Sequence, residues 1–234
     1  MNVELCRKTV NFGECRFIIF DEGTFDMDEI KISFTQFMKY SFLNPNKRLQ
    51  QVKEWKYTNY DDESKYDYWK RLKLGIVKFH KEGLELSFLD QIPSSVPIDH
   101  RDNYRFAVNN YKKFLKRNPK AEWFKTQKKY YHYENLHINV GPELGLRIKG
   151  VPHFIKLYCT DDGGLTQKLD RGKADLMLHL MKLAIPEQLT EDSVLALINI
   201  KNDARIMRYN SNNEYLDGNL VLNMKSFIDA WNMV

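Results

Sequence analysis

The sequence predicts a mixed α/β fold, in which a central mixed β-sheet is flanked by helices and the N-terminal half is mainly helical. Three patterns predict it. Apolar residues recur at helical spacing in several stretches of the N-terminal half. Two strand-like runs meet at a tight turn at 149–150, and a long amphipathic stretch at 165–185 separates them from the apolar run 193–200.

Length and composition exclude several classes of protein. The 234 residues are 43% hydrophobic and 29% charged, which is typical of a globular chain with a sizeable core and not of a disordered or membrane protein. We expect one compact domain, with an N-terminal strand and a helical region at 1–135 and the α/β core at 136–234. The opening MNVELCRKTV has no apolar signal-peptide core, and the three cysteines have no metal-ligand spacing, so we expect a cytoplasmic protein.

The chain begins with an expected short strand at 15–20. Ser33 and Gln36 have the spacing of a capping box, which predicts the start of a helix, and Pro45 closes that helix. Residues 49–60 are interpreted as a strand or an extended segment.

Two further helices are expected before the change to β structure. One runs to about His80 and has Gly83 as its C-terminal stop, and the other covers about 101–117. The prolines between them favour a loop or a short strand at 84–100.

The second half alternates strands and helices. Two strands at 137–148 and 151–159 form a hairpin, and the apolar strand 193–200 is expected to be buried on both faces. Residues 205–209 are its expected hairpin partner, and 219–233 form a terminal helix.

The hairpin is the most informative stretch. A two-residue turn at 149–150 pairs residues whose numbers sum to 299, so Glu143 stands opposite Lys156 and Gly145 opposite Phe154. All four lie on one face, because strand side chains alternate. One interpretation is a cross-strand ion pair, which contributes about 0.2–1 kcal/mol. The alternative is a catalytic centre.

This arrangement resembles the PD-(D/E)XK nuclease superfamily, and within it the RecB-like branch. PE at 142–143 stands where the family has PD, and FIK at 154–156 stands where it has (D/E)XK. The serine-started helix within 31–48 and GIVKFH at 75–80 are similar to other motifs of that branch, although the second is one residue too long. The resemblance implies a restriction-endonuclease-like core that is degenerate, because Phe154 replaces the second acid.

The resemblance also implies a nuclease that cuts DNA or RNA with Mg²⁺ or Mn²⁺. Glu143 is then the first metal ligand, and Lys156 is the lysine that orients water or offsets phosphate charge. A phenyl ring cannot replace the second carboxylate as a ligand. Asp170 is the first candidate to take its place and Asp175 the second, while His80 would supply a nitrogen ligand.

Positive charge is concentrated in one segment, although the whole chain carries only +5. Residues 111–130, here called the basic segment, hold eight Lys/Arg against Glu122, a local charge of +7 (8 − 1), with aromatic residues interleaved. Lysines neutralise phosphates and aromatic rings stack on unpaired bases; the alternative is a solvated helix face whose aromatic residues fill the core. The residues expected to contact nucleic acid are Lys112, Lys113, Lys116, Arg117, Lys120, Trp123, Lys125, Lys128 and Lys129.

Three functions therefore stay open. The first is a metal-dependent nuclease, and the second is a nucleic-acid-binding module on the same fold that does not cut, with DNA as the expected partner. The third is a protein-interaction or structural protein in which the basic segment is only a soluble face. No Walker loop, GxGxxG, HExxH, GxSxG or CxxC pair in the sequence indicates another chemistry.

Overall fold

The computed structural model describes residues 29–57, 68–159, 168–210 and 213–234. The expected strand at 15–20, together with Cys6 and Cys15, lies outside the described residues.

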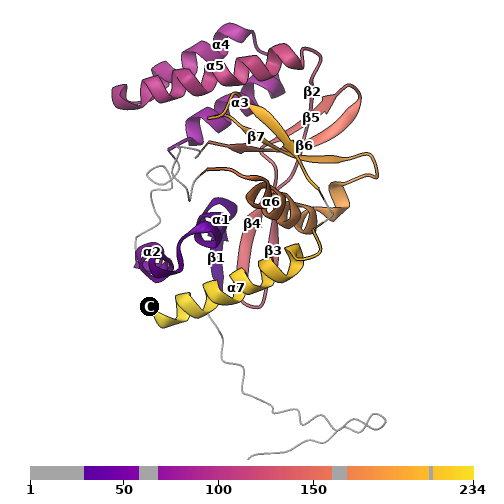
Figure 1. Ribbon diagram of the computed structural model, residues 1–234. Helices are drawn as coiled ribbons and strands as arrows, with labels where there is room; N and C mark the ends of the chain where they lie inside the picture. Colours follow the sequence, from indigo (N-terminus) through magenta and orange to yellow (C-terminus); the bar gives the residue numbers. More distant parts are fainter. Residues whose placement is uncertain (1–28, 58–67, 160–167, 211–212) are drawn as a thin grey trace, which may run out of the picture.

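Along the described chain, one strand is followed by a group of helices, then by five strands, an α-helix, two further strands and a last helix (Figure 1). The strands are β1 (Ile30–Ser33), β2 (Glu122–Phe124), β3 (Lys129–Tyr133), β4 (Leu136–Val140), β5 (Leu144–Ile148), β6 (Val151–Tyr158), β7 (Val194–Asn199) and β8 (Arg205–Arg208). The α-helices are α1 (Phe34–Phe42), α2 (Pro45–Tyr57), α3 (Lys70–Glu82), α4 (Leu86–Gln91), α5 (Arg101–Arg117), α6 (Arg171–Ala184) and α7 (Leu216–Met233). Short 3-10 helices are η2 (Ile92–Ser95), η3 (Ile98–His100) and η4 (Pro186–Gln188).

The strands form two mixed sheets, which confirms the expected mixed α/β fold. The larger sheet has the order β2-β5-β6-β7-β8, in which β6 and β7 are parallel and the other neighbours are antiparallel. The chain passes through α6 between the two parallel strands, as a parallel connection requires. The smaller sheet has the order β1-β4-β3, with β1 parallel and β3 antiparallel to β4.

Helices cover both faces of the five-stranded sheet. One face packs Ile155 and Leu157 of β6 beneath α3, α4 and α5, the helices at the top of Figure 1. The other face packs Phe154 and Tyr158 against α6, which also contacts the three-stranded sheet and α7. Because β6 is covered on both sides, every residue from His153 to Tyr158 is buried, as expected for a central strand.

Two local expectations for the N-terminal half are wrong. The described part of 49–60 is helical, because α2 begins at Pro45, a residue that suits the first position of a helix. The Asn44 side chain accepts a hydrogen bond from the Asn46 amide there (3.1 Å). The segment 84–100 also contains α4 and two 3-10 turns in place of a loop or strand.

The expected single strand 137–148 is divided between the two sheets. β4 pairs with β1 and β3, whereas β5 pairs with β2 and β6, and Gly141, Pro142 and Glu143 link them. Gly141 has no room for a side chain, since a Cβ atom there would lie 2.8 Å from the Lys128 Cα atom. Pairing with β1 and β3 therefore holds β4 in the small sheet, and pairing with β2 and β6 holds β5 in the large one.

Several sequence signals are confirmed. Ser33 caps α1 in a complete capping box with Gln36, and Gly83 ends α3 in the left-handed conformation (φ 61°). β8 is the antiparallel partner of β7, and the terminal helix α7 is present. Within the described ranges, every helix is too short or too polar to cross a lipid bilayer.

Candidate nucleic-acid interface and the buried charge pair

The β5–β6 hairpin has the register that the sequence predicts. Ile148 pairs with Val151 and Gly145 with Phe154. The turn residues Lys149 (φ 53°) and Gly150 (φ 82°) both have positive φ, as a type I′ turn requires. The numbers of paired residues sum to 299, as the sequence predicts. This register brings Glu143, which directly precedes β5, opposite Lys156.

Glu143 and Lys156 meet on one face of the sheet. The Lys156 Nζ atom donates to Glu143 Oε1 at 2.5 Å, and the Leu157 amide donates to Glu143 Oε2 at 3.0 Å. The side chains are only 7% and 9% exposed, and the Lys156 Nζ atom lies 4.7 Å from the centroid of the Phe34 ring. The pair is therefore buried, and both carboxylate oxygens already accept hydrogen bonds.

Electrostatics around Lys156 reflect this burial. Burial lowers the pKa of the Lys156 ammonium group below its ordinary value, and the neighbouring Glu143 carboxylate opposes the shift. Lys73 and Lys128 lower the pKa further through charge repulsion. Glu143 thus acts as the counter-charge of a buried lysine.

The residues do not fit the divalent-metal site that the resemblance implies. Phe154 occupies the position of the second acid. His80 lies on α3 beneath the opposite face of the sheet, where its Nε2 atom shares a hydrogen bond with the Tyr111 hydroxyl (2.5 Å). Asp170 caps α6 by accepting from the Lys173 amide (2.8 Å).

The second replacement candidate, Asp175, is also engaged elsewhere. Its carboxylate binds Arg171 Nε at 2.8 Å and the Asn210 amide at 3.1 Å. Among the residues that the structure describes, no three carboxylate, imidazole or thiol side chains gather around one point that would hold a metal ion. Asp170, Asp175 and His80 are therefore each engaged in contacts of their own.

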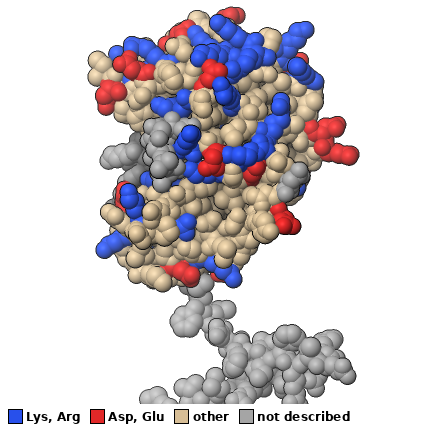
Figure 2. Space-filling view, viewed as in Figure 1, with Lys and Arg blue, Asp and Glu red and all other residues tan. Residues whose placement is uncertain are grey.

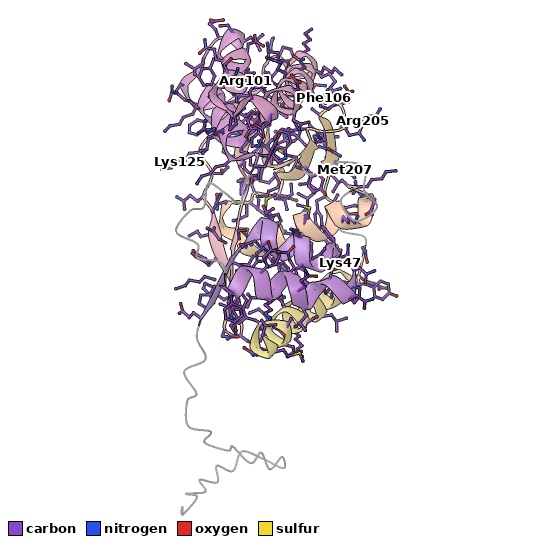
Figure 3. The ribbon with its side chains drawn as sticks, turned by 90° about the vertical axis from the view of Figure 1, so that its left-hand side faces the viewer. Lys47, Arg101, Phe106, Lys125, Arg205 and Met207 are labelled. Carbon is purple, nitrogen blue, oxygen red and sulfur yellow. The ribbon has the colours of Figure 1, made fainter. Side chains whose placement is uncertain are left out.

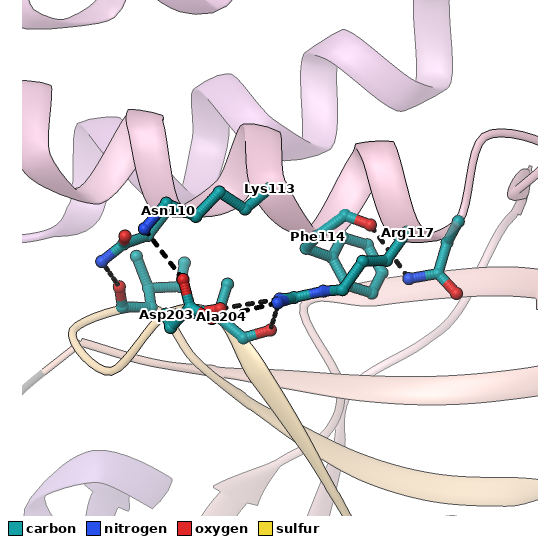
Figure 4. A network of polar contacts seen from close by, with 8 residues as sticks. Asn110, Lys113, Phe114, Arg117, Asp203 and Ala204 are labelled. Atoms are coloured by element: carbon teal, nitrogen blue, oxygen red, sulfur yellow. Dashed lines mark hydrogen bonds and ion pairs between the residues drawn. The ribbon is translucent and has the colours of Figure 1, made fainter.

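Three residues of the basic segment hold the fold together. Lys113 and Arg117 reach from α5 to the turn between β7 and β8 (Figure 4), where both bind Asp203 (2.9 and 3.1 Å). Arg117 also donates to the carbonyls of Asp203 (2.7 Å) and Ala204 (2.9 Å), two residues in the left-handed conformation. Lys112 pairs with Asp90 (2.5 Å).

The remaining lysines of the basic segment face solvent. Lys116, Lys120, Lys125 and Lys128 are exposed, and the described residues offer none of them an ion-pair partner. Lys129 lies 3.7 Å from Glu187, and both side chains are about half exposed. Trp123 is partly buried against the core beneath α3 and α5. The segment therefore contains three structural cations, Lys112, Lys113 and Arg117, and four free ones, Lys116, Lys120, Lys125 and Lys128.

Lys120 and Lys125 flank β2, an edge strand of the five-stranded sheet, whereas Lys116 lies at the end of α5 and Lys128 directly precedes β3. Figure 3 places Lys125 on the opposite side of the molecule from Arg205 and Met207, which belong to the other edge strand, β8. Figure 2 shows Lys and Arg side chains gathered over the half that contains α3, α4 and α5, with fewer over α1, α2 and α7. On this face of the molecule, positive charge is thus concentrated in the half that contains α3, α4 and α5.

The same sheet face carries a feature that the sequence did not reveal. The Phe124 ring of β2 covers Gly145, where a Cβ atom would lie 2.7 Å from the ring, and meets Phe154 edge-on (5.2 Å between centroids, 78°). The Arg147 guanidinium group lies over the Phe124 ring at 5.7 Å. The alternation at Glu143, Gly145 and Arg147 signalled a shared face, but nothing in the sequence placed Phe124 there.

Arg147 opens onto a hollow of about 730 Å³ between the β5–β6 turn and the loop before β7. Its walls are Phe124, Lys125, Arg147, Gly150, Val151, Pro152, Phe154, Gln188, Thr190, Asp192 and Ser193. We call it the Arg147 groove. Neither Glu143 nor Lys156 lines it.

The sequence matches no protein-family model, and comparisons with curated proteins and with solved structures give no significant match.

Proposed function

We propose that this protein binds nucleic acid through the free cations of the basic segment and does not cleave it. The observation that carries the proposal is the set of four exposed lysines, Lys116, Lys120, Lys125 and Lys128, between the end of α5 and the start of β3. Because no carboxylate among the described residues neutralises them, their charge is available to phosphates.

Two further observations support the proposal. Aromatic side chains are close in sequence to the lysines, with the partly exposed Phe124 on β2 and the exposed Tyr130 on β3. Cations interleaved with rings are typical of surfaces that track a nucleic-acid backbone. The order of β5, β6, α6 and β7, with β6 and β7 parallel, is also the order that the resemblance to PD-(D/E)XK nucleases implies.

The absence of cleavage is proposed from the charge pair. One Glu143 carboxylate oxygen accepts a hydrogen bond from Lys156 and the other accepts one from the Leu157 amide, so both oxygens stabilise the folded structure. Mg²⁺ in proteins is held by carboxylates together with water, which requires access to solvent. A pair that is less than one tenth exposed and lies under Phe34 lacks that access.

The experiment is fluorescence anisotropy with labelled oligonucleotides over a range of salt concentrations. We expect the logarithm of the wild-type association constant to fall linearly with the logarithm of salt. Replacing Lys116, Lys120, Lys125 and Lys128 by glutamine should weaken binding at low salt and reduce the slope by about 3, since each phosphate contact contributes about 0.7–0.9.

A matched variant replaces four exposed lysines at the other end of the molecule, Lys39, Lys47, Lys53 and Lys225. It loses the same charge, so equal weakening in both variants would show only a response to net charge and would contradict the proposed surface. Failure of the wild-type protein to bind any oligonucleotide at low salt would overturn the proposal itself.

Cleavage is tested separately by incubating labelled DNA and RNA with Mg²⁺ or Mn²⁺. We expect intact substrate. Metal-dependent cutting that disappears in a folded Glu143→Gln variant would overturn the non-catalytic part of the proposal and restore the nuclease interpretation.

A further inference from the structure

We propose that the Arg147 groove takes up an unpaired nucleobase, so that the protein selects single-stranded over duplex nucleic acid. This inference rests on the proposed function and specifies its substrate class. Three observations support it: the hollow itself, the Arg147 guanidinium group over the Phe124 ring (here called the platform), and the neighbouring free Lys125.

The first step is continuity with the cationic surface. Phe124 and Lys125 belong to the basic segment and also line the groove. A strand whose phosphates contact Lys120, Lys125 and Lys128 therefore passes the mouth of the groove. Lys125 is exposed and has no ion-pair partner among the described residues, so it remains available to a phosphate at this point.

The second step is the platform. The Arg147 side chain is exposed, and its guanidinium carbon lies over the Phe124 ring, 5.7 Å from the ring centroid. The planar guanidinium group stacks on aromatic rings, and bases splayed out of single strands stack on such planes. Phe154 braces Phe124 from the edge, so the platform is held by the packed sheet.

The third step is size. The hollow of about 730 Å³ lies within the range of small-molecule sites, about 300–1,000 Å³, and is bounded by Pro152, Gln188 and Thr190 on its other walls. Only an unpaired base can turn a stacking face toward such a hollow, because the bases of a duplex are already stacked and paired.

The groove also argues against a purely ionic, strand-independent surface. Asp192 lines it opposite the two cations Lys125 and Arg147, so the walls carry a net charge of +1. A surface built only to hold phosphates gains nothing from apolar walls such as Val151 and Phe154. A weakly cationic hollow whose walls combine apolar side chains with the polar groups of Gln188, Thr190 and Ser193 instead suits a neutral aromatic base, which has a stacking face and polar edges, next to a phosphate.

The experiment compares three probes of equal length by fluorescence anisotropy: a DNA single strand, the same strand made fully abasic, and the duplex. The abasic strand keeps the phosphates and lacks the bases. We expect the wild-type protein to bind the normal strand about tenfold more tightly than either other probe, because base stacking on a protein platform contributes that order of affinity.

Two variants remove the platform. Arg147→Lys keeps the charge but loses the planar group, and Phe124→Leu keeps an apolar side chain but loses the ring. Both should abolish most of the preference for the normal strand while leaving affinity for the abasic strand within about twofold. Because Arg147 is exposed, its variant remains informative if Phe124→Leu does not fold.

Phe106→Leu is the matched control. Phe106 is an exposed ring on α5 with the Lys201 ammonium group over it at 5.8 Å, and it lies outside the groove (Figure 3). It should leave the preference unchanged.

The outcomes separate this inference from the function on which it rests. Equal binding of all three probes, or a preference that survives in Arg147→Lys and Phe124→Leu, overturns the base-binding groove and leaves the nucleic-acid surface standing. No binding of any probe overturns both.

Discussion

The Glu143 carboxylate holds the Lys156 ammonium group with one oxygen and the Leu157 amide with the other. Its second contact has a structural reason. β6 extends beyond the end of β5, so the Leu157 amide lies past the paired strand, and the Glu143 side chain accepts the hydrogen bond there. A buried polar group that finds no partner costs about 1–3 kcal/mol.

Breaking this pair from one side should be strongly destabilising. In Glu143→Leu the Lys156 charge loses its counter-ion and the Leu157 amide its acceptor, so we expect a loss of about 3–5 kcal/mol in the free energy of unfolding. Urea denaturation followed by circular dichroism measures it. Adding Lys156→Met should recover part of the loss, because the double variant buries no unpaired charge. A single-variant loss below about 1 kcal/mol would contradict the structural role.

Gly145 should not tolerate a side chain. In Gly145→Ala the new Cβ atom would lie 2.6 Å from the Phe124 carbonyl oxygen and 2.6 Å from Thr126 Cγ2, so β2 must shift or detach. We expect lower stability and weaker nucleic-acid binding. Gly218→Ala is the control, because nothing lies within 4 Å of that position and alanine favours a helix by about 1 kcal/mol. Equal effects of the two substitutions would refute the close packing of Phe124 on Gly145.

Arg117 should matter for the fold and little for nucleic acid. Arg117→Lys keeps the positive charge but removes the guanidinium group that donates hydrogen bonds to the carbonyl oxygens of Asp203 and Ala204. We expect faster hydrogen exchange in the turn between β7 and β8, with oligonucleotide affinity unchanged within about twofold. An affinity loss like that of Lys125→Gln, with normal exchange in the turn, would return Arg117 to the binding surface.

His80 makes stability depend on pH. Burial lowers its pKa from the ordinary 6.5 to about 4, so between these values the unfolded chain binds a proton that the folded protein does not. Stability therefore falls as the pH drops from about 6.5 toward 4, by roughly 3 kcal/mol over the whole window. Urea denaturation at pH 7.5 and 4.5 measures the fall.

The double variant His80→Phe, Tyr111→Phe is the control for this titration, since it removes both partners of the buried hydrogen bond. Its stability should change less with pH than that of the wild-type protein. An identical change in both proteins would place the acid sensitivity elsewhere.

Local signals predicted much of the fold. The turn at 149–150 determines the register of β5 and β6, because a two-residue loop admits one pairing and its residues accept positive φ. The capping box at Ser33 likewise depends on residues within one helical turn. In contrast, the division of 137–148 depends on β1 and Lys128, and no local pattern encodes those contacts.

The candidate site shows the same limit. The sequence predicted that Glu143 and Lys156 share a face, but burial under Phe34, more than 100 residues away in the chain, was not visible in it. The sequence also could not separate the paired cations of the basic segment from the free ones, because all of them have similar neighbours in sequence. Asp90 and Asp203, which neutralise Lys112, Lys113 and Arg117, lie 22 to 90 residues away.

Three residues, 141–143, carry the backbone from the small sheet directly into the large one. A connection of three residues restricts relative movement of the two sheets, and the Glu143 carboxylate at its end accepts a hydrogen bond from the Leu157 amide of β6. Separation of the sheets would therefore break this hydrogen bond. Denaturation should consequently proceed as a single cooperative event, with fluorescence and circular dichroism tracing one coincident curve.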